Sequence, residues 1–263
     1  MLQIRGLAMI FDTHAHYDDE AFDEDRESLL LSMKGHNIEK IVNIGASPAS
    51  NEMTLKLVQE YDFMMAAFGI HPNDADKLDE ESFKRIEELC RMEQCVAVGE
   101  IGLDYYWPEP EAGIQKIWFE FQMELARSIR KPIVVHSRDA AQDTYDMMKA
   151  SDARDIGGVV HCFSYSKEMA KRFVDMGFFI GIGGVVTFKN SRVLKEVVEY
   201  IPLEHLVLET DCPYLAPTPF RGKRNSSLLL PYVIEEISRL KGISTEEVEQ
   251  TTWENAHRLY RLV

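Results

Sequence analysis

Two histidines separated by one residue lie near the start of the chain and could bind a metal ion. They are His14 and His16, and they follow an apolar run at residues 9–11 that is typical of a short buried strand. Side chains alternate between the two faces of an extended chain, so both imidazoles point to the same side. A lone histidine near a strand end is more often a hydrogen-bonded core or surface residue, but a pair on one face favours a metal site.

Further side chains of metal-binding type come directly after other apolar runs: they are Glu100, His136, His161 and Asp211. Together with the histidine pair, these imidazoles and carboxylates exceed the ligands of one tetrahedral site. We therefore expect two divalent ions, with Glu100 bridging them. The histidine pair and Asp211 would hold one ion, and His136 and His161 would hold the other.

A pair of divalent ions is typical of enzymes that hydrolyse bonds. Two ions about 3.5 to 4 Å apart lower the pKa of a shared water and stabilise both the attacking and the leaving oxygen. Glu100 would be catalytic through its bridging position, and Asp211 could also accept the proton of the attacking water. A role of Asp211 as a plain ligand, without proton transfer, agrees equally well with the sequence.

Apolar runs and helical patterns alternate along the chain and predict how these side chains are positioned. The expected strands are residues 9–11, 38–44, 63–68, 95–98, 133–135, 159–160, 178–182 and 206–208. The expected helices are residues 23–34, 50–60 with Ser50 as N-cap, 81–91, 114–129, 140–149, 227–241 and 245–260. This alternation predicts an α/β fold, a single (β/α)8 TIM-type barrel, in which the carboxyl ends of the strands meet on one face. An open doubly wound sheet is the alternative, but no Gly-x-Gly-x-x-Gly turn follows the first strand.

The helix expected at residues 114–129 carries the clearest hydrophobic stripe in the chain. Its apolar residues recur at helical spacing: they are Ile114, Ile117, Trp118, Phe121, Leu125 and Ile129. We interpret this stripe as core packing rather than as part of a cofactor site.

Length and composition indicate one domain. The chain has 263 residues, 45% of them hydrophobic, which is enough to bury a full core. No apolar run reaches the length that a bilayer requires, and residues 1–8 lack the apolar core of a signal peptide, so Met9 could be an alternative start. The four cysteines show no Cys-x-x-Cys spacing, which favours the reduced cytoplasm and inert thiols.

The net charge of the chain opposes nonspecific binding to polyanions. The sequence has 29 basic and 44 acidic residues, a net charge of −15, so a nucleic-acid substrate would need a local basic rim. Basic residues follow three of the expected strands: they are Arg138, Lys189, Arg192, Arg221, Lys223 and Arg224. The fork of an arginine matches two phosphate oxygens, although such charge runs are also typical of solvated loops.

Aromatic residues share these loops: they are Tyr105, Tyr106, Trp107, Phe163, Tyr165, Phe188, Tyr214 and Phe220. Rings that face the cleft could stack on unpaired bases, which favours single strands or frayed ends. The other rings could pack between loops. A narrow barrel mouth does not straddle an intact duplex easily, so we expect attack on ends rather than internal cutting.

Seven motifs of this chain occur in the order typical of one enzyme family. They are His14-Ala15-His16, Gly69-Ile70-His71-Pro72, Gly99-Glu100-Ile101-Gly102-Leu103-Asp104-Tyr105, His136-Ser137-Arg138, His161-Cys162-Phe163-Ser164, Glu209-Thr210-Asp211-Cys212-Pro213-Tyr214-Leu215-Ala216-Pro217 and Arg221-Gly222-Lys223-Arg224-Asn225. From about Phe11 to its end, the chain resembles the TatD family of metal-dependent deoxyribonucleases, which belongs to the amidohydrolase-like barrels. The resemblance implies a TatD-like (β/α)8 barrel hydrolase domain at residues 9–263, after an irregular extension at residues 1–8.

The resemblance also implies metal ligands at the positions already named, and exonuclease activity with Mg²⁺. The carried-over ligands are His14, His16, Glu100, His136, His161 and Asp211. Four histidine ligands suit Zn²⁺, Mn²⁺ or Fe²⁺ better than the hard, oxygen-seeking Mg²⁺. We therefore expect two divalent ions, Mg²⁺, Mn²⁺ or Zn²⁺, and tighter binding of a transition metal even where Mg²⁺ supports turnover.

The expected function is the metal-dependent hydrolysis of phosphodiester bonds, by a deoxyribonuclease that removes nucleotides from single-stranded DNA ends. We expect DNA as the partner, and neither a membrane nor an obligate protein partner. The alternative is an amidohydrolase-type enzyme for a small amide, ester or lactone, which would not need the basic loops. An aldolase-type barrel needs a lysine at the carboxyl end of a strand, and Lys131 precedes its strand. A role as an interaction scaffold would leave the metal-ligand set unexplained.

The expected substrate contacts are His71, Arg138, Arg221 and Tyr105. His71 could bind a phosphate or orient the water, or it could simply fix the turn that follows it. Glu209 precedes Asp211 by two residues and so faces the same way, either beside a metal ligand or in an ion pair with a rim arginine. We expect His205 and His257 to lie outside the site.

Overall fold

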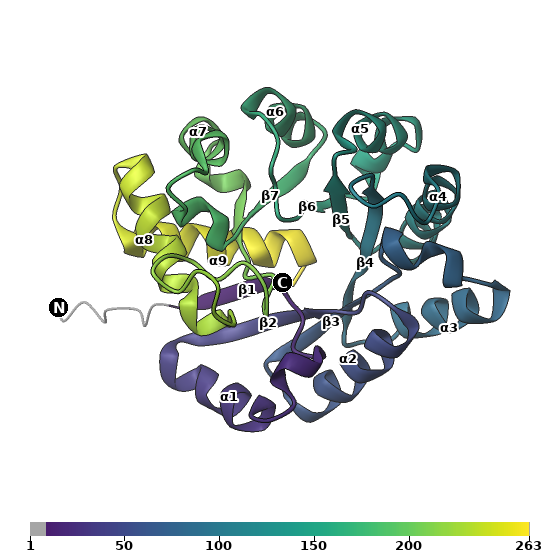
Figure 1. Cartoon of the computed structure of the whole chain (residues 1–263), viewed down its shortest axis with the longest axis horizontal. Coiled ribbons are helices and arrows are strands. Elements are labelled where there is room, and N and C mark those ends of the chain that lie inside the picture. Colours follow the sequence, from purple (N-terminus) through teal and green to yellow (C-terminus); the bar gives the residue numbers. More distant parts are fainter. Residues whose placement is uncertain (1–8, 263) are drawn as a thin grey trace.

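In the computed structural model, which describes residues 9–262, parallel strands form one eight-stranded sheet in chain order. The sheet curves almost into a closed barrel, with helices around its outside (Figure 1). The strands are β1 (Ile10–Ala15), β2 (Ile38–Ile44), β3 (Met64–Phe68), β4 (Cys95–Asp104), β5 (Ile133–Arg138), β6 (Gly158–Val160), β7 (Phe178–Ile182) and β8 (Leu206–Leu208). The predicted (β/α)8 barrel is thereby confirmed, and the open doubly wound sheet is excluded.

The helices follow the strands in alternation. They are α1 (Arg26–Ser32), α2 (Pro48–Glu60), α3 (Glu80–Cys90), α4 (Ala112–Ile129), α5 (Ala141–Ala150), α6 (Lys167–Asp175), α7 (Arg192–Tyr200), α8 (Leu230–Lys241) and α9 (Thr245–Tyr260). No range was predicted for α6 or α7, which are short and bury only two and three side chains. The predicted N-cap of α2 was wrong. The cap is Ser47, whose hydroxyl accepts from the Ser50 amide, because Pro48 fits the first turn of a helix.

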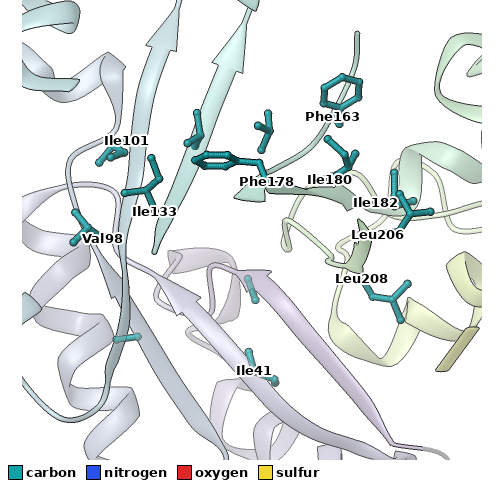
Figure 2. Close-up of a cluster of buried hydrophobic side chains, with 14 of the residues drawn as sticks. Ile41, Val98, Ile101, Ile133, Phe163, Phe178, Ile180, Ile182, Leu206 and Leu208 are labelled. Atoms are coloured by element: carbon teal, nitrogen blue, oxygen red, sulfur yellow. The ribbon is translucent and has the colours of Figure 1, made fainter. Parts of the chain in front are cut away.

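Two buried layers hold the barrel together. Inside it, side chains such as Phe11, Val96 and Val134 meet Leu259 and Tyr260 of α9, which packs against β1, β6 and β8. The larger layer lies between strands and helices, and Figure 2 shows its contributions from β2, β4, β5, β7 and β8. Packing inside the barrel and packing against the outer helices therefore both hold the strands, and with them the carboxyl ends of the strands, in place.

The predicted core stripe of α4 was wrong. Ile114, Ile117 and Phe121 are 37%, 55% and 54% exposed, although Leu125 is buried as expected. The buried face of α4 instead carries Gln115, Phe119, Gln122, Met123, Leu125 and Ala126.

The two buried glutamines explain this rotation of α4. The side-chain oxygen of Gln115 accepts from the Asp104 amide at 2.8 Å, and that of Gln122 accepts from the Ile70 amide at 2.8 Å. Each side chain also donates to a carbonyl, Gln115 to Asp104 and Gln122 to Ile70. Backbone groups of buried loops must find such partners, so α4 turns its glutamines inward and fixes the chain after β3 and at the end of β4.

The ends of the sheet meet at the seam between β8 and β1. Ala15 and Cys212 form an isolated parallel bridge there, and the His14 carbonyl accepts from the Asp211 amide at 2.9 Å. The buried Asp12 carboxylate ties the seam further. One oxygen accepts from the His14 and Thr210 amides at 3.2 and 3.1 Å, and the other accepts from the Thr210 and Ser227 hydroxyls, both at 2.7 Å.

Within residues 9–262 we find no helix that is both long and apolar enough to cross a membrane. All four cysteines are free thiols, and three of them are buried. The expected irregular extension, residues 1–8, lies outside the described residues, as does Val263.

We expect Asp12→Ala to lower the free energy of unfolding by about 3 kcal/mol, because it removes the acceptor of the buried His14 amide and of the Ser227 hydroxyl. It also leaves the Thr210 amide and hydroxyl with only their longer bonds to the His14 carbonyl, both at 3.3 Å. Asp12→Asn should cost much less, since its amide oxygen can accept from the backbone and its amino group can donate to the hydroxyls. Urea unfolding of both variants tests this. Equal losses would show that the charge of Asp12, rather than its hydrogen bonds, holds the seam.

Candidate metal centre

The histidine pair lies at the carboxyl end of β1, with His14 inside the strand and His16 directly after its last residue, Ala15. The strand therefore runs further than the predicted residues 9–11. The Nε2 atoms of His14 and His16 are 3.0 Å apart, so both rings face the same point, as their spacing predicts. His16 Nδ1 donates to the Ile44 carbonyl at 2.9 Å. This bond fixes the ring and leaves the lone pair of Nε2 for a ligand.

The Glu100 carboxylate lies between two groups of histidines. One oxygen is 2.6 Å from His161 Nε2 and 2.8 Å from His136 Nδ1. The other oxygen is 3.5 Å from His14 Nε2 and 3.7 Å from His16 Nε2. Glu100 thus occupies the place that a bridging ligand needs.

Asp211 follows β8 and completes the group on the β1 side. Its Oδ1 is 3.4 Å from His16 Nε2 and 3.7 Å from His14 Nε2. The Asp211 side chain is 18% exposed and that of Glu100 4%, so Asp211 is the carboxylate that solvent reaches more easily.

Three overlapping clusters of ligand atoms could hold metal ions. They are His14, His16 and Asp211; His14, Glu100 and His161; and His71, Glu100 and His136. The first cluster is the grouping that the sequence predicts. His136 and His161, which the sequence assigns to the second ion, also lie together: His136 Nδ1 is 3.2 Å from His161 Nε2, and both contact the same Glu100 oxygen. The other two clusters add His71 beside His136 and bring His14 close to His161.

His71 has a place in the turn and in the centre at the same time. Its Nδ1 accepts from the Asn73 amide at 3.1 Å, which fixes the turn after β3. Its Nε2 is 3.7 Å from a Glu100 oxygen, and its ring packs edge-on against His136 at 4.2 Å between centroids. His71 therefore both fixes the turn that follows it and lies beside the centre. Its contact with substrate stays a prediction.

Asp104 is a buried member of the site that sequence reasoning missed. Its Oδ2 accepts from His136 Nε2 at 3.0 Å, which turns His136 Nδ1 toward Glu100. The prediction ended β4 at Val98, but the strand continues to Asp104. Alternation along that longer strand would have placed Glu100 and Asp104 on the same face.

Gly102 lets β4 and β5 come close enough for these bonds. A Cβ atom at Gly102 would lie 1.9 Å from the His136 carbonyl oxygen, which no side chain tolerates. The glycine between Glu100 and Asp104 therefore permits both carboxylates to contact the same imidazole.

Glu209 is buried beside the centre. Its Oε1 accepts from the Cys162 amide at 2.5 Å, whereas Oε2 has no partner among the described residues. Burial raises the pKa of Glu209 to about 8, although His161 and the Cys162 amide oppose that rise. Glu209 is therefore a neighbour of the candidate ligand His161, and no bond from Glu209 to a rim arginine is found among residues 9–262. His205 and His257 pack against Phe179 and Trp253 instead, as expected.

The imidazoles near the centre have widely separated pKa values. Burial and the neighbouring His161 lower the pKa of His14 to about 4, and burial and His136 lower that of His71 to about 3. Burial would also lower the pKa of His16, but Asp211 and Glu100 raise it to about 10. In the same way, Asp104 and Glu100 overcome the effect of burial and raise the pKa of His136 to about 9.

Arginines stacked on aromatic rings stand on two sides of the barrel mouth. The Arg138 guanidinium lies 3.8 Å from the centre of the Tyr106 ring, and that of Arg221 lies 4.6 Å from the centre of the Phe188 ring. Tyr106 also packs edge-on against Trp107, and both rings are about half exposed. These positions fit the expected rim.

Other members of the expected rim have partners within the protein. Arg224 forms a two-bonded ion pair with Asp25, and Arg192 pairs with Glu196. The Tyr105 hydroxyl donates to Asp143 at 2.8 Å. A contact of Tyr105 with substrate therefore stays a prediction.

The donor set fits divalent cations. Imidazole and carboxylate groups lie within 4.8 Å of one another in each cluster. The carboxylates of Glu100 and Asp211 are buried and would be costly to ionise without positive charge nearby, yet the surrounding histidines hold the pKa of each below its usual value. Ionised carboxylates and imidazole lone pairs that point at one place are what Zn²⁺ and Mn²⁺ require.

Comparisons with known proteins agree with a hydrolase that depends on metal. A family profile described as TatD related DNase matches residues 11–261. YabD of Bacillus subtilis, named an uncharacterized metal-dependent hydrolase, is 44% identical over 254 residues that cover 97% of this chain and 100% of that protein. YcfH of Escherichia coli has the same description and is 35% identical over 257 residues, 96% of each chain.

A solved structure agrees with the fold along the whole chain. The crystal structure of YjjV, a TatD homolog from Escherichia coli, superposes with a TM-score of 0.90 at 30% sequence identity. The superposition covers 97% of this chain and 98% of that one.

Binding of divalent ions at pH 7.5 should release about two protons, because metal ligands must be deprotonated and the pKa values of His16 and His136 are about 10 and about 9. The apparent affinity should accordingly rise with pH up to those values. Titration calorimetry with Mn²⁺ in buffers of different ionisation enthalpy measures the release. A binding enthalpy independent of the buffer would show that these imidazoles are neutral before the metal binds.

Proposed function

This chain belongs to the TatD family of metal-dependent hydrolases, and on that premise we propose that it removes nucleotides from the ends of single-stranded DNA. The observation that carries the proposal is the combination of a buried metal-ligand cluster with arginines stacked on aromatic rings around it. The cluster supplies the chemistry of hydrolysis, and the rim supplies the charge and stacking surfaces that a single strand needs.

We propose that the centre holds two divalent ions. His14, His16 and Asp211 would hold one ion, and His136 and His161, whose facing nitrogens are 3.2 Å apart, would hold the other. Glu100 lies between the two groups, and His71 lies close to the second. Bound divalent ions lower the pKa of water and stabilise charge on the oxygens of a phosphodiester.

The carboxylates of the chain then have separate tasks. Glu100 is the more deeply buried, and its two oxygens face different histidines, so its task is to keep the two halves of the centre together. Asp211 is more exposed, and its lowered pKa keeps it ionised at neutral pH. Asp211 would accept the proton of the attacking water, and Asp104 would hold the His136 ring in place.

The rim positions the substrate. Arg138 and Arg221 would each contact a phosphate, and the rings beneath them hold the guanidinium planes in place. The exposed rings of Tyr106 and Trp107 offer stacking surfaces for unpaired bases. The free thiols fit a reaction in the reduced cytoplasm.

Digestion of an end-labelled single-stranded DNA by metal-stripped protein, reloaded with Mg²⁺ or Mn²⁺, tests the function. We expect stepwise release of mononucleotides, and at least a hundredfold lower kcat in Asp211→Asn because the proton acceptor is lost. Asp139→Asn is the matched control. Asp139 also has a positive φ, as Asp211 does, but it belongs to none of the ligand clusters, so its variant should keep wild-type kcat.

Two other results of this digestion would overturn the proposal. Equal cleavage of circular and linear strands would exclude attack on ends. No cleavage by protein shown to contain two ions per chain would favour a hydrolase of a small amide, ester or lactone instead.

The rim arginines should affect binding more than the chemical step. Arg138→Ala and Arg221→Ala should each raise KM about tenfold and reduce the slope of log affinity against log salt by about one, with kcat little changed. Arg91→Ala is the control, because Arg91 is exposed just before β4, at the opposite end of the barrel. Salt dependence unchanged in both rim variants would mean that the two arginines do not contact phosphates.

A further inference from the structure

A cavity of about 270 Å³ opens beside the candidate metal centre, over the carboxyl end of β7. Asp211 forms part of its wall, so anything in the cavity lies next to a group that we place in the metal centre. Its size is below the roughly 300 to 1,000 Å³ of pockets for drug-sized ligands. The space therefore suits one ring system rather than a larger molecule.

Glycines leave a bare backbone at the floor of this cavity. A Cβ atom at Gly181 would lie 2.1 Å from a Glu209 carboxylate oxygen, and one at Gly184 would lie 2.1 Å from the Leu215 carbonyl oxygen. These positions require glycine because other groups press against them. Gly183 lies between them, and it leaves the floor free of side chains at a third position.

Most of the exposed surface of the cavity walls is apolar, and Ser164, Ser191 and Thr210 add hydroxyl groups. Phe163, Val185, Val193 and Leu215 supply its hydrophobic surface, and Asn190 supplies an amide. All lining residues belong to the described part of the chain, and among them Arg192 is the one cation.

The charged side chains of the cavity offer no free cation, because the acidic ones are Glu209 and Asp211 and the basic one, Arg192, is paired. The Arg192 guanidinium pairs with Glu196 at 2.9 Å, and the Glu209 carboxylate accepts from the Cys162 amide. A phosphate would find no uncompensated cation among these lining residues, whereas a flat uncharged ring would find apolar contacts. The walls of the cavity therefore suit the base of a nucleotide and not its phosphate.

We propose that this cavity receives the nucleobase of the nucleotide whose phosphate lies at the metal centre. The inference rests on the DNA hydrolase function proposed above, because it needs a phosphate beside Asp211. The base enters between Phe163 and Val193, and its sugar remains at the mouth. Because the walls are mostly apolar, the cavity binds the ring of any base and discriminates little between sequences.

Binding of thymidine 5′-monophosphate and 2-deoxyribose 5-phosphate to the Mn²⁺-loaded protein isolates the contribution of the base. We expect the nucleotide to bind about tenfold more tightly than the sugar phosphate, by titration calorimetry. Val193→Trp should fill the mouth of the cavity, since Val193 is 49% exposed at the start of α7. In that variant the two affinities should become equal, with the affinity for the sugar phosphate unchanged.

Ile117→Trp is the matched control, because Ile117 is 55% exposed on α4 and does not line the cavity. It should keep the tenfold preference. Equal affinities of wild type for the two probes, in a protein that digests DNA, would overturn the cavity proposal and leave the hydrolase function intact. Failure to bind either probe and to digest DNA would overturn both.

Discussion

The structure depends on the buried Asp12 carboxylate at the seam between β8 and β1. Its four hydrogen bonds reach the backbone of His14 and Thr210 and the hydroxyls of Thr210 and Ser227. Burial raises the pKa of Asp12 to about 6, and these bonds oppose that rise. Among residues 9–262, strand pairing at the seam is one bridge, so this carboxylate and the bond between the His14 carbonyl and the Asp211 amide together set the position of His14 relative to Asp211.

Hydrogen bonds from helix α4, in the outer ring of helices, position the side of the centre that lies away from the seam. Gln122 and Gln115 of α4 bond the backbone after β3 and at the end of β4, and these segments carry His71 and Asp104. Asp104 in turn orients His136. A helix that contributes no ligand thereby fixes the half of the centre that lies away from the seam.

The sequence was sufficient for the barrel and for the convergence of the expected ligands, because strand order alone brings the carboxyl ends together. The sequence did not predict that Asp104 belongs to the site, and it did not predict which face of α4 is buried. Both errors have one cause: polar side chains were placed outside the buried part of an element, Asp104 beyond the end of β4 and the two glutamines off the core face of α4. In the structure these side chains complete buried hydrogen bonds. Glu100 and Asp104 lie inside β4, and Gln115 and Gln122 lie on the buried face of α4.

The electrostatics of the centre explain how its geometry can exist before a metal binds. Glu100, Asp104 and Asp211 all have lowered pKa values although burial alone would raise them. The compensating charge comes from His161, His136 and His16, whose pKa values are raised by the same carboxylates. Protons on these imidazoles lie where cations would bind, so the carboxylates stay ionised and oriented in either state. Metal then competes with protons for a preformed site, and little rearrangement of the chain is required.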